Sequence, residues 1–358
     1  MAEPTIAQAY KTSSDEVNNQ PIQYVGGRNH DATVAVLDSF QPHSDGFVHG
    51  DAVTQVLQRE GGLDEEHIQR IDNGSVVTLA ATRLMMSSGT EPARDRLDAA
   101  IQLSALEPMR RTNLALEDIA NDPDSKIKTI NQSQGFSRWN TFQSLQRASI
   151  EYSEDGKPQL TEAGRHIFEG LGLPPETNRE TLRAFADRAF ARIDGIYDNS
   201  PAIQREVERH SQVSENLANQ GVNYVLSAGN NRENLEMYQE AGLNLPDDFD
   251  DSLLSNPHNV VVGAMNTQGT PDHSDDQIAS FSTSDPEVDF LANGVSVPIQ
   301  SNGQSITADG TSFSAPLVAA ELHVLREQNP SLSAGQLRNL LRNSAGPNVI
   351  GSNVAVVR

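Results

Sequence analysis

Residues 308–320 read ADGTSFSAPLVAA and predict the start of a buried helix. From Ser314 onward apolar residues recur at helical spacing, and small alanines fill the gaps between them. Pro316 has no N–H and is tolerated in a first helical turn, so we expect the helix to begin close to Ser312. Gly310 gives the preceding turn its conformational freedom. Ser312 is therefore expected at the positive end of a helix dipole, beside N–H groups that have no helical partner.

A serine in this position has two interpretations. Serine and threonine are favoured helix caps, and this segment alone favours an ordinary cap at Ser312. The same position also suits a nucleophile whose product is an oxyanion, because the free N–H groups stabilise negative charge. The rest of the chain has to decide between the two.

Composition narrows the classes of protein and of partner. The chain has 358 residues, enough for one large domain or two small ones. It has no cysteine, which excludes disulfides and thiolate metal sites. Its formal net charge is −23, from 49 acidic against 26 basic residues. Such a surface repels nucleic acid and anionic membranes, so we expect neither as a partner. It favours cationic substrates or bound Ca²⁺, and it says nothing about the oligomeric state.

The N-terminal segment predicts little structure. Residues 1–25 are mostly polar and are expected to form a flexible leader without the basic and apolar regions of a signal peptide. No stretch of the sequence is long and apolar enough to span a membrane. We therefore expect either a cytoplasmic protein or one exported through a non-standard or removed signal.

Strand and helix patterns alternate along most of the chain. Buried strands are expected at 31–40, 75–85, 126–135, 222–231 and 259–266, and helices at 49–60 and 93–121. This alternation predicts an α/β fold of three layers, with a mostly parallel β-sheet flanked by helices, over residues 26–358. Residues from about 140 to 210 are rich in charge and helical pattern. They are expected to form a helical insertion that either caps the functional cleft or covers one face of the sheet.

Asp38, His49 and Ser312 form a candidate catalytic set. Asp38 ends a predicted strand, His49 opens a predicted helix, and Ser312 opens another far downstream. An imidazole can take the proton of a serine hydroxyl near neutral pH, while a carboxylate fixes its tautomer. Asp…His…Ser is one of the chain orders in which this triad occurs. Asn230, after another strand, could donate to an oxyanion. His43 is the nearest alternative base, but it lacks the glycine and the helix that follow His49.

These residues lie in motifs that resemble those of the subtilisin-like serine proteases, the subtilases. GTSFSAP at 310–316 matches the family's Gly-Thr-Ser-x-Ser/Ala-x-Pro motif, and VLSAGNN at 225–231 contains its Ala-Gly-Asn. INQSQG at 130–135 resembles the strand whose edge binds extended substrate. The resemblance implies a serine endopeptidase that forms an acyl-enzyme on protein or peptide substrates and needs no cofactor for the chemistry. It also implies a propeptide domain, for which the residues before the first predicted strand are too few.

The resemblance further implies that substrate adds as a strand along two segments of the chain. The implied substrate-binding residues are Ser133, Gln134, Gly135, Ser227, Ala228 and Gly229. No acidic residue is evident at the floor of the pocket for the residue before the scissile bond. We therefore expect an apolar or mixed preference there.

The motifs also depart from the family. Phe40 replaces the usual glycine after the aspartate, and Asp51 follows His49-Gly50 where Thr or Ser is usual. We expect Asp51 to raise the pKa of His49 or to hold its ring differently. The Asp–His connection is short, so the family's calcium loop cannot be assumed. The acidic pairs at 247–248, 250–251 and 275–276 are expected to be either solvated loops or ligands of a structural calcium ion.

Because of these departures the sequence leaves other functions open. One alternative is a subtilase-fold binding protein, or a pseudoprotease with weak or no activity. Another is a carboxyl-type serine peptidase with a glutamate base and an aspartate at the oxyanion position. His49 and Asn230 speak against that last function.

Overall fold

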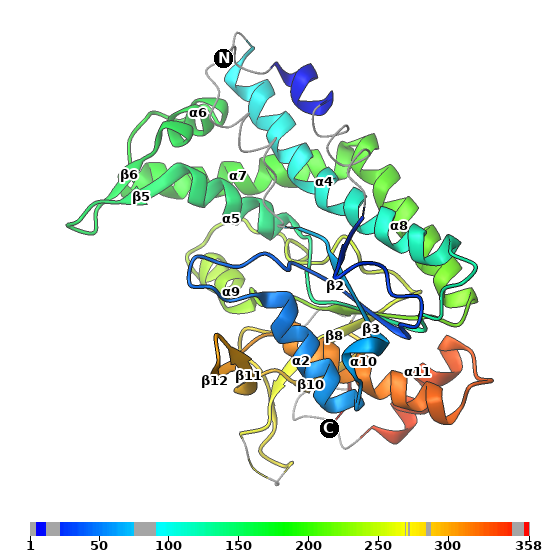
Figure 1. The fold of residues 1–358 in the computed structure, drawn as a ribbon. Helices are drawn as coiled ribbons and strands as arrows, with labels where there is room; N and C mark the ends of the chain where they lie inside the picture. Colours follow the sequence, from blue (N-terminus) through cyan, green and yellow to red (C-terminus); the bar gives the residue numbers. More distant parts are fainter. Residues whose placement is uncertain are drawn as a thin grey trace.

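A nine-stranded, mostly parallel sheet lies between layers of helices in the described part of the chain (Figure 1). The computed structural model describes residues 5–11, 22–74, 91–268, 270, 273–283, 288–345 and 354–357. The three-layer α/β arrangement predicted from the sequence is confirmed.

The order of the strands across this sheet differs from their order along the chain. Across the sheet they are β1 (Gln23–Val25), β3 (Ile68–Asp72), β2 (Val34–Asp38), β4 (Thr129–Gln132), β7 (Asn223–Ser227), β8 (Val260–Asn266), β10 (Phe290–Asn293) and β13 (Ala355–Val356). β1 pairs antiparallel with β3, and β9 (Gln277–Ile278) pairs antiparallel with β8. The other neighbours are parallel.

Four of the five predicted strands are confirmed, as β2, β4, β7 and β8. The fifth, at 75–85, lies outside the described residues. β3, which neighbours β2, was not predicted.

Helices cover both faces because the buried strands are apolar on both. α2 (His49–Gly61), α10 (Thr311–Gln328) and α11 (Ala334–Ser344) cover one face, and α4 (Ala93–Asn121) and α8 (Pro201–Asn219) cover the other (Figure 1). Successive side chains of a strand point to opposite faces. Val34 and Val36 of β2 accordingly pack with α2 and α10, whereas Ala35 and Leu37 pack with α4 and α8.

The chain between β4 and β7 builds a further helical layer. α5 (Arg138–Ser149), α6 (Glu162–Gly170) and α7 (Arg179–Asn199) pack on α4 around a buried aromatic core that includes Trp139, Phe142, Phe168, Phe185 and Phe190. A hairpin of β5 (Ile150–Tyr152) and β6 (Pro158–Leu160) projects from this layer (Figure 1). The helical pattern of the sequence did not predict this hairpin.

Smaller elements complete the described chain. They are a short helical segment at residues 6–11, the 3₁₀ turn η1 (Glu65–His67), α9 (Arg232–Glu240), and a second hairpin of β11 (Val297–Ser301) and β12 (Gln304–Ala308). Within the described ranges, no helix has the length and apolar character needed to cross a lipid bilayer.

The parallel arrangement brings several strand ends to one edge of the sheet. Asp38 is the last residue of β2, Ser133 follows β4, and Asn230 lies three residues beyond β7. α10, whose first turn carries Ser312, packs against β4 and β7. Carboxyl ends of parallel strands are where the functional sites of such sheets usually lie.

Candidate active site

A hydrogen bond joins the candidate acid and the candidate base. Asp38 shares the strand face of Val34 and Val36, so its side chain is directed toward α2, and it is fully buried. His49, the first residue of α2, donates from Nδ1 to Asp38 Oδ1 at 2.7 Å. Burial alone would lower the pKa of His49, but the charge and the hydrogen bond of Asp38 outweigh it and raise the pKa.

Aromatic rings hold the imidazole in place. The His49 ring lies 5.9 Å from the ring of Phe313 and 6.3 Å from that of Phe47, centroid to centroid. The imidazole is therefore in contact with the residue that follows Ser312. His43 packs on Phe47 at 5.8 Å, and in the described chain it makes no hydrogen bond to Asp38.

Ser312 lies in the first turn of α10 and is 8% exposed. Its hydroxyl donates to the backbone carbonyl of Ser133 at 3.1 Å. Among the described residues, no hydrogen bond joins this hydroxyl to His49. The structure thus brings Asp38 and His49 together and packs Phe313, the neighbour of Ser312, on His49, while the Ser312 hydroxyl is bonded elsewhere.

Pro316 lies further into the helix than the sequence suggested. α10 begins at Thr311, so Pro316 is beyond the first turn, and the expectation of a first-turn proline is wrong. Its missing N–H would have donated to the carbonyl of Ser312. Ser133 Oγ donates to that carbonyl instead, at 2.9 Å, and so ties the end of β4 to the start of α10.

Asn230 is fixed by the start of the same helix. Its Oδ1 accepts hydrogen bonds from the backbone N–H of Thr311 at 2.8 Å and from Thr311 Oγ1 at 3.0 Å. This leaves its Nδ2 group without an acceptor in the described part of the chain. Gly310 has a φ of 149°, and a Cβ there would lie 3.2 Å from Asn230 Nδ2, so glycine suits this close approach. The arrangement keeps a side-chain amide donor beside the Ser312 N–H, which makes no backbone hydrogen bond in the described part of the chain.

A cavity of about 170 Å³ opens beside Ser312 and Asn230, which both line it. Five of the six predicted substrate-binding residues also line it: Ser133, Gly135, Ser227, Ala228 and Gly229. Gln134 is not among the lining residues, and its side-chain amide donates to the carbonyl of Gly74 at 3.0 Å.

The lining also contains residues that the sequence did not single out for this site. Ser137 and Asn140 line the cavity and form the capping box of α5. A capping serine soon after a strand end is a signal that could have placed them there. Asp250 lines the cavity too and is only 5% exposed. An acidic residue that the sequence did not indicate thus lines this cavity, and Asp250 is not part of a solvated loop.

The structure explains the departures around Asp38 and His49. The ring of Phe40 packs on Gly50, where a Cβ would lie 2.8 Å from the ring. The guanidinium of Arg70 lies 6.0 Å from the Phe40 ring and pairs with Asp51 at 3.3 Å. Asp51 is therefore engaged by Arg70, and the raised pKa of His49 comes from Asp38 instead.

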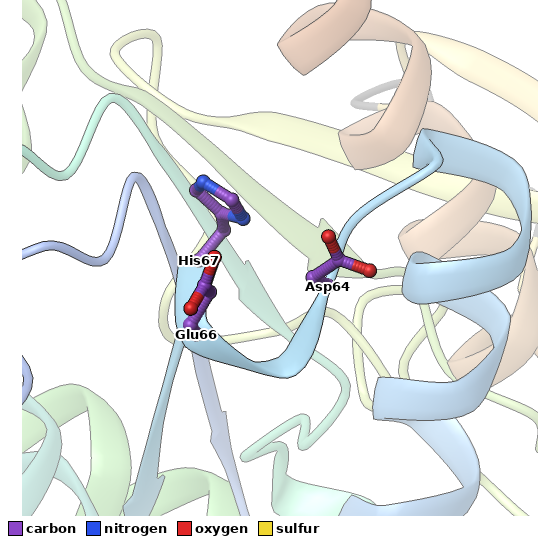
Figure 2. A group of neighbouring side chains, drawn as sticks. All are labelled: Asp64, Glu66 and His67. Atoms are coloured by element: carbon purple, nitrogen blue, oxygen red, sulfur yellow. The ribbon is translucent and has the colours of Figure 1, made fainter.

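One group of three or more potential metal ligands gathers in the part of the chain that is described. Asp64, Glu66 and His67 lie at η1, with their ligand atoms within 4.8 Å of one another (Figure 2). Asp64 and Glu66 are exposed to solvent, and exposed acidic groups are common on proteins without a bound ion. None of the three acidic pairs considered above belongs to this group.

Comparison with known proteins points to one family. A model described as the subtilase family matches residues 170–355. Serine protease AprX of Bacillus subtilis (strain 168) is 29% identical over 120 residues, which are 26% of this chain and 27% of AprX. Subtilisin E of the same organism is 33% identical over 90 residues, 25% of this chain and 22% of subtilisin E. The aligned part thus spans about a quarter of each relative.

A solved structure is similar over more of the chain but at lower identity. The crystal structure of a lanthipeptide protease matches with a TM-score of 0.44 and 16% identity, covering 91% of this chain and 84% of that one.

Proposed function

Because the chain belongs to the subtilase family, we propose that it is a serine endopeptidase with Asp38, His49 and Ser312 as its catalytic triad. The observation that supports this most strongly is the 2.7 Å hydrogen bond between His49 and buried Asp38. It lies beside the start of α10, where Ser312 is found. The altered motifs around Asp38 and His49 have thus kept the acid–base pair together.

In the proposed reaction, Ser312 attacks the carbonyl carbon of a peptide bond. Its hydroxyl first rotates from the Ser133 carbonyl toward Nε2 of His49, which takes the proton. His49 then gives that proton to the leaving amine, and an acyl-enzyme remains on Ser312. His49 next deprotonates a water, which attacks the ester, and Ser312 is restored when His49 returns the proton. Asp38 fixes the His49 tautomer and stabilises the imidazolium throughout.

Two donors would stabilise the oxyanion in each tetrahedral intermediate. They are Nδ2 of Asn230 and the backbone N–H of Ser312, which belongs to a first helical turn. The contact of Asn230 Oδ1 with the Thr311 N–H directs the amide and so supports this role. Because the donors are fixed before substrate arrives, little reorganisation is needed in the transition state.

Substrate would lie as an extended strand between residues 133–135 and 227–229, and its side chains would enter the adjoining cavity. We propose that residues 26–358 act as one peptidase domain, with about 140–210 as an insertion. Subtilases need no cofactor for catalysis. A structural calcium ion is a further part of the proposal, and thermal unfolding in calcium against a chelator tests it.

Covalent labelling tests the proposed nucleophile. A fluorophosphonate probe should label the wild-type protein, and Ser312→Ala should abolish the labelling. Ser314→Ala is the matched control, because Ser314 Oγ is fully buried and has no hydrogen-bond partner in the described chain. That control should fold and label like the wild type. A folded wild-type protein that resists the probe would contradict the proposal.

A second candidate function is peptide binding without cleavage. The observation that favours it is the bond of Ser312 Oγ to the Ser133 carbonyl, with none to His49 among the described residues. Such a protein would bind peptides in the same cavity, remain unlabelled by the probe, and leave the peptides intact over hours.

A further inference from the structure

Asp250 brings a buried acidic side chain into the lining of the cavity. Of the described residues that line the cavity, Asp250 is the one with an ionisable side chain. It is 5% exposed and comes from the segment between α9 and β8. The inference that this side chain governs the choice of substrate rests on the proposed function as a serine endopeptidase.

Neutral groups satisfy the Asp250 carboxylate. Its Oδ2 accepts from Thr283 Oγ1 at 2.7 Å, and its Oδ1 accepts from Asn231 Nδ2 at 2.9 Å and from Ser137 Oγ at 3.1 Å. In the described part of the chain no lysine, arginine or histidine forms an ion pair with it. Burial raises the pKa of Asp250, and these hydrogen bonds act in the opposite direction. The carboxylate is thus held in place without a counter-charge.

The carboxylate lies directly behind the chain segment that would bind substrate. Gly229 has a φ of 114°, and a Cβ there would lie 2.9 Å from Thr283 Oγ1 and 3.3 Å from Asp250 Oδ2. Gly229 is adjacent to Asn230, the proposed oxyanion donor. A substrate side chain that enters beside this segment therefore approaches the carboxylate.

We propose that Asp250 selects peptides that carry lysine or arginine immediately before the scissile bond. The incoming cation supplies the counter-charge that the protein does not provide, in a site where water is largely excluded and the attraction is strong. The net charge of −23 adds to this preference, because it draws basic peptides toward the whole molecule.

The cavity has room and hydrogen-bonding capacity for such a side chain. Its volume of about 170 Å³ far exceeds the roughly 10–15 Å³ that one water needs. The single hydroxyl proton of Ser137 has two acceptors, Asn140 Oδ1 at 3.0 Å and Asp250 Oδ1 at 3.1 Å. When it turns to Asn140, a lone pair of Asp250 becomes free for the substrate cation. An apolar side chain would bring no donor to this carboxylate and would leave its charge without a counter-charge.

Peptide cleavage by the purified chain tests the proposal. The peptides differ only in the residue before the scissile bond, which is Lys, Arg, Leu, Phe or Glu. We expect kcat/KM for Lys or Arg to exceed that for Leu by about 100-fold, the scale of a buried charge pair. Asp250→Asn should remove most of that ratio, while Asp247→Asn, an exposed neighbour outside the cavity lining, should keep it. A wild type that cleaves Leu or Phe peptides as well as Lys peptides would overturn the proposal.

A binding measurement separates this proposal from the proposed chemistry. In the Ser312→Ala background, peptides that end in lysine or leucine are titrated calorimetrically, with and without Asp250→Asn. Tighter binding of the lysine peptide that is lost in Asp250→Asn supports the selectivity, even if the wild type cleaves no peptide. The absence of cleavage would then contradict the proposed triad and not the selectivity. Equal binding of both peptides overturns the selectivity while labelling of Ser312 still supports the triad. The ranking of the peptides by kcat/KM uses the wild-type protein alone, so the test remains possible if the Asp250→Asn protein folds poorly.

Discussion

Ser133 and Ser312 hold each other through two hydrogen bonds. Ser133 Oγ donates to the Ser312 carbonyl at 2.9 Å, and Ser312 Oγ donates to the Ser133 carbonyl at 3.1 Å. The first bond replaces the helical N–H that Pro316 lacks. The second occupies the hydroxyl proposed as nucleophile. The same pair therefore fixes the start of α10 and sets the resting position of Ser312.

The first bond can be measured by a double-mutant cycle. Ser133→Ala should lower the free energy of unfolding by roughly 1–3 kcal/mol, because the buried Ser312 carbonyl loses its donor. In a Pro316→Ala background the loss should be smaller, since residue 316 then has an N–H that can donate within the helix. Urea unfolding of the four proteins gives the coupling. Equal losses in both backgrounds would show that Pro316 and Ser133 act independently.

The raised pKa of His49 predicts the acid limb of the activity profile. A general base must be deprotonated, so kcat/KM should fall with acidity around a midpoint above pH 6.5. Asp38→Asn removes the charge that raises this pKa, so burial should move the midpoint below 6.5. The rate should also fall by about 10⁴-fold, as when the acid of such a triad is neutralised. The pH dependence of kcat/KM for both proteins checks this.

Asp51→Asn is the control for that profile. Asp51 pairs with Arg70, so its neutralisation should leave the midpoint unchanged. A midpoint that falls with Asp51→Asn as much as with Asp38→Asn would mean that Asp51 also acts on His49. In linkage terms, the raised pKa of His49 adds stability that is fully present below pH 6.5 and lost as pH rises through the folded-state pKa.

Substitutions can separate the structural contact of Asn230 with Thr311 from its proposed role as an oxyanion donor. Asn230→Ala should lower kcat by about 10²–10³-fold, with KM little changed, because it removes an oxyanion donor. It should also lower Tm, since the Thr311 N–H loses its acceptor. Asn230→Asp keeps that acceptor, so it should lose the activity but keep the Tm. A fully active Asn230→Ala protein would refute the oxyanion role.

His210 should make the protein sensitive to acid. It is 1% exposed, and burial lowers its pKa from 6.5 to about 4. The unfolded chain takes up this proton near pH 6.5 and the folded chain only near pH 4, so stability is lost as pH falls between them. The loss attributable to His210 is about 3 kcal/mol. Urea unfolding at pH 7 and pH 4 should show it in the wild type and in the exposed control His30→Gln, and much less in His210→Gln.

The sequence predicted those parts of the fold whose signals are local. β2 (VAVLD) and β7 (NYVLS) each contain a continuous apolar run, and α10 begins at a Gly-Thr-Ser sequence, so each can be read within one window. β3 reads IQRID and escaped prediction because polar residues interrupt it. Gln69 is nevertheless 2% exposed, because Asn29 and Gly27 from another segment hydrogen-bond its amide.

The residues of the candidate site likewise divide into those with a local sequence signal and those without one. Asp38 and His49 were found because each lies at the end of an element with a clear local pattern. Asp250 looked like one half of a solvated acidic pair. Its burial depends on Ser137, Asn231 and Thr283, and no local window of sequence brings these together. The bond between Ser312 and Ser133 could not be predicted either, since it joins residues 179 positions apart.

The two residues of the α5 capping box take part both in the start of a helix and in the lining of the cavity. Ser137 and Asn140 start the first helix of the layer between β4 and β7, and both line the cavity beside Ser312. A change at Ser137 or Asn140 would therefore alter both the start of this layer and the lining of the cavity. In homologues with different helices here, we expect the substrate preference and the architecture of this helical layer to differ together.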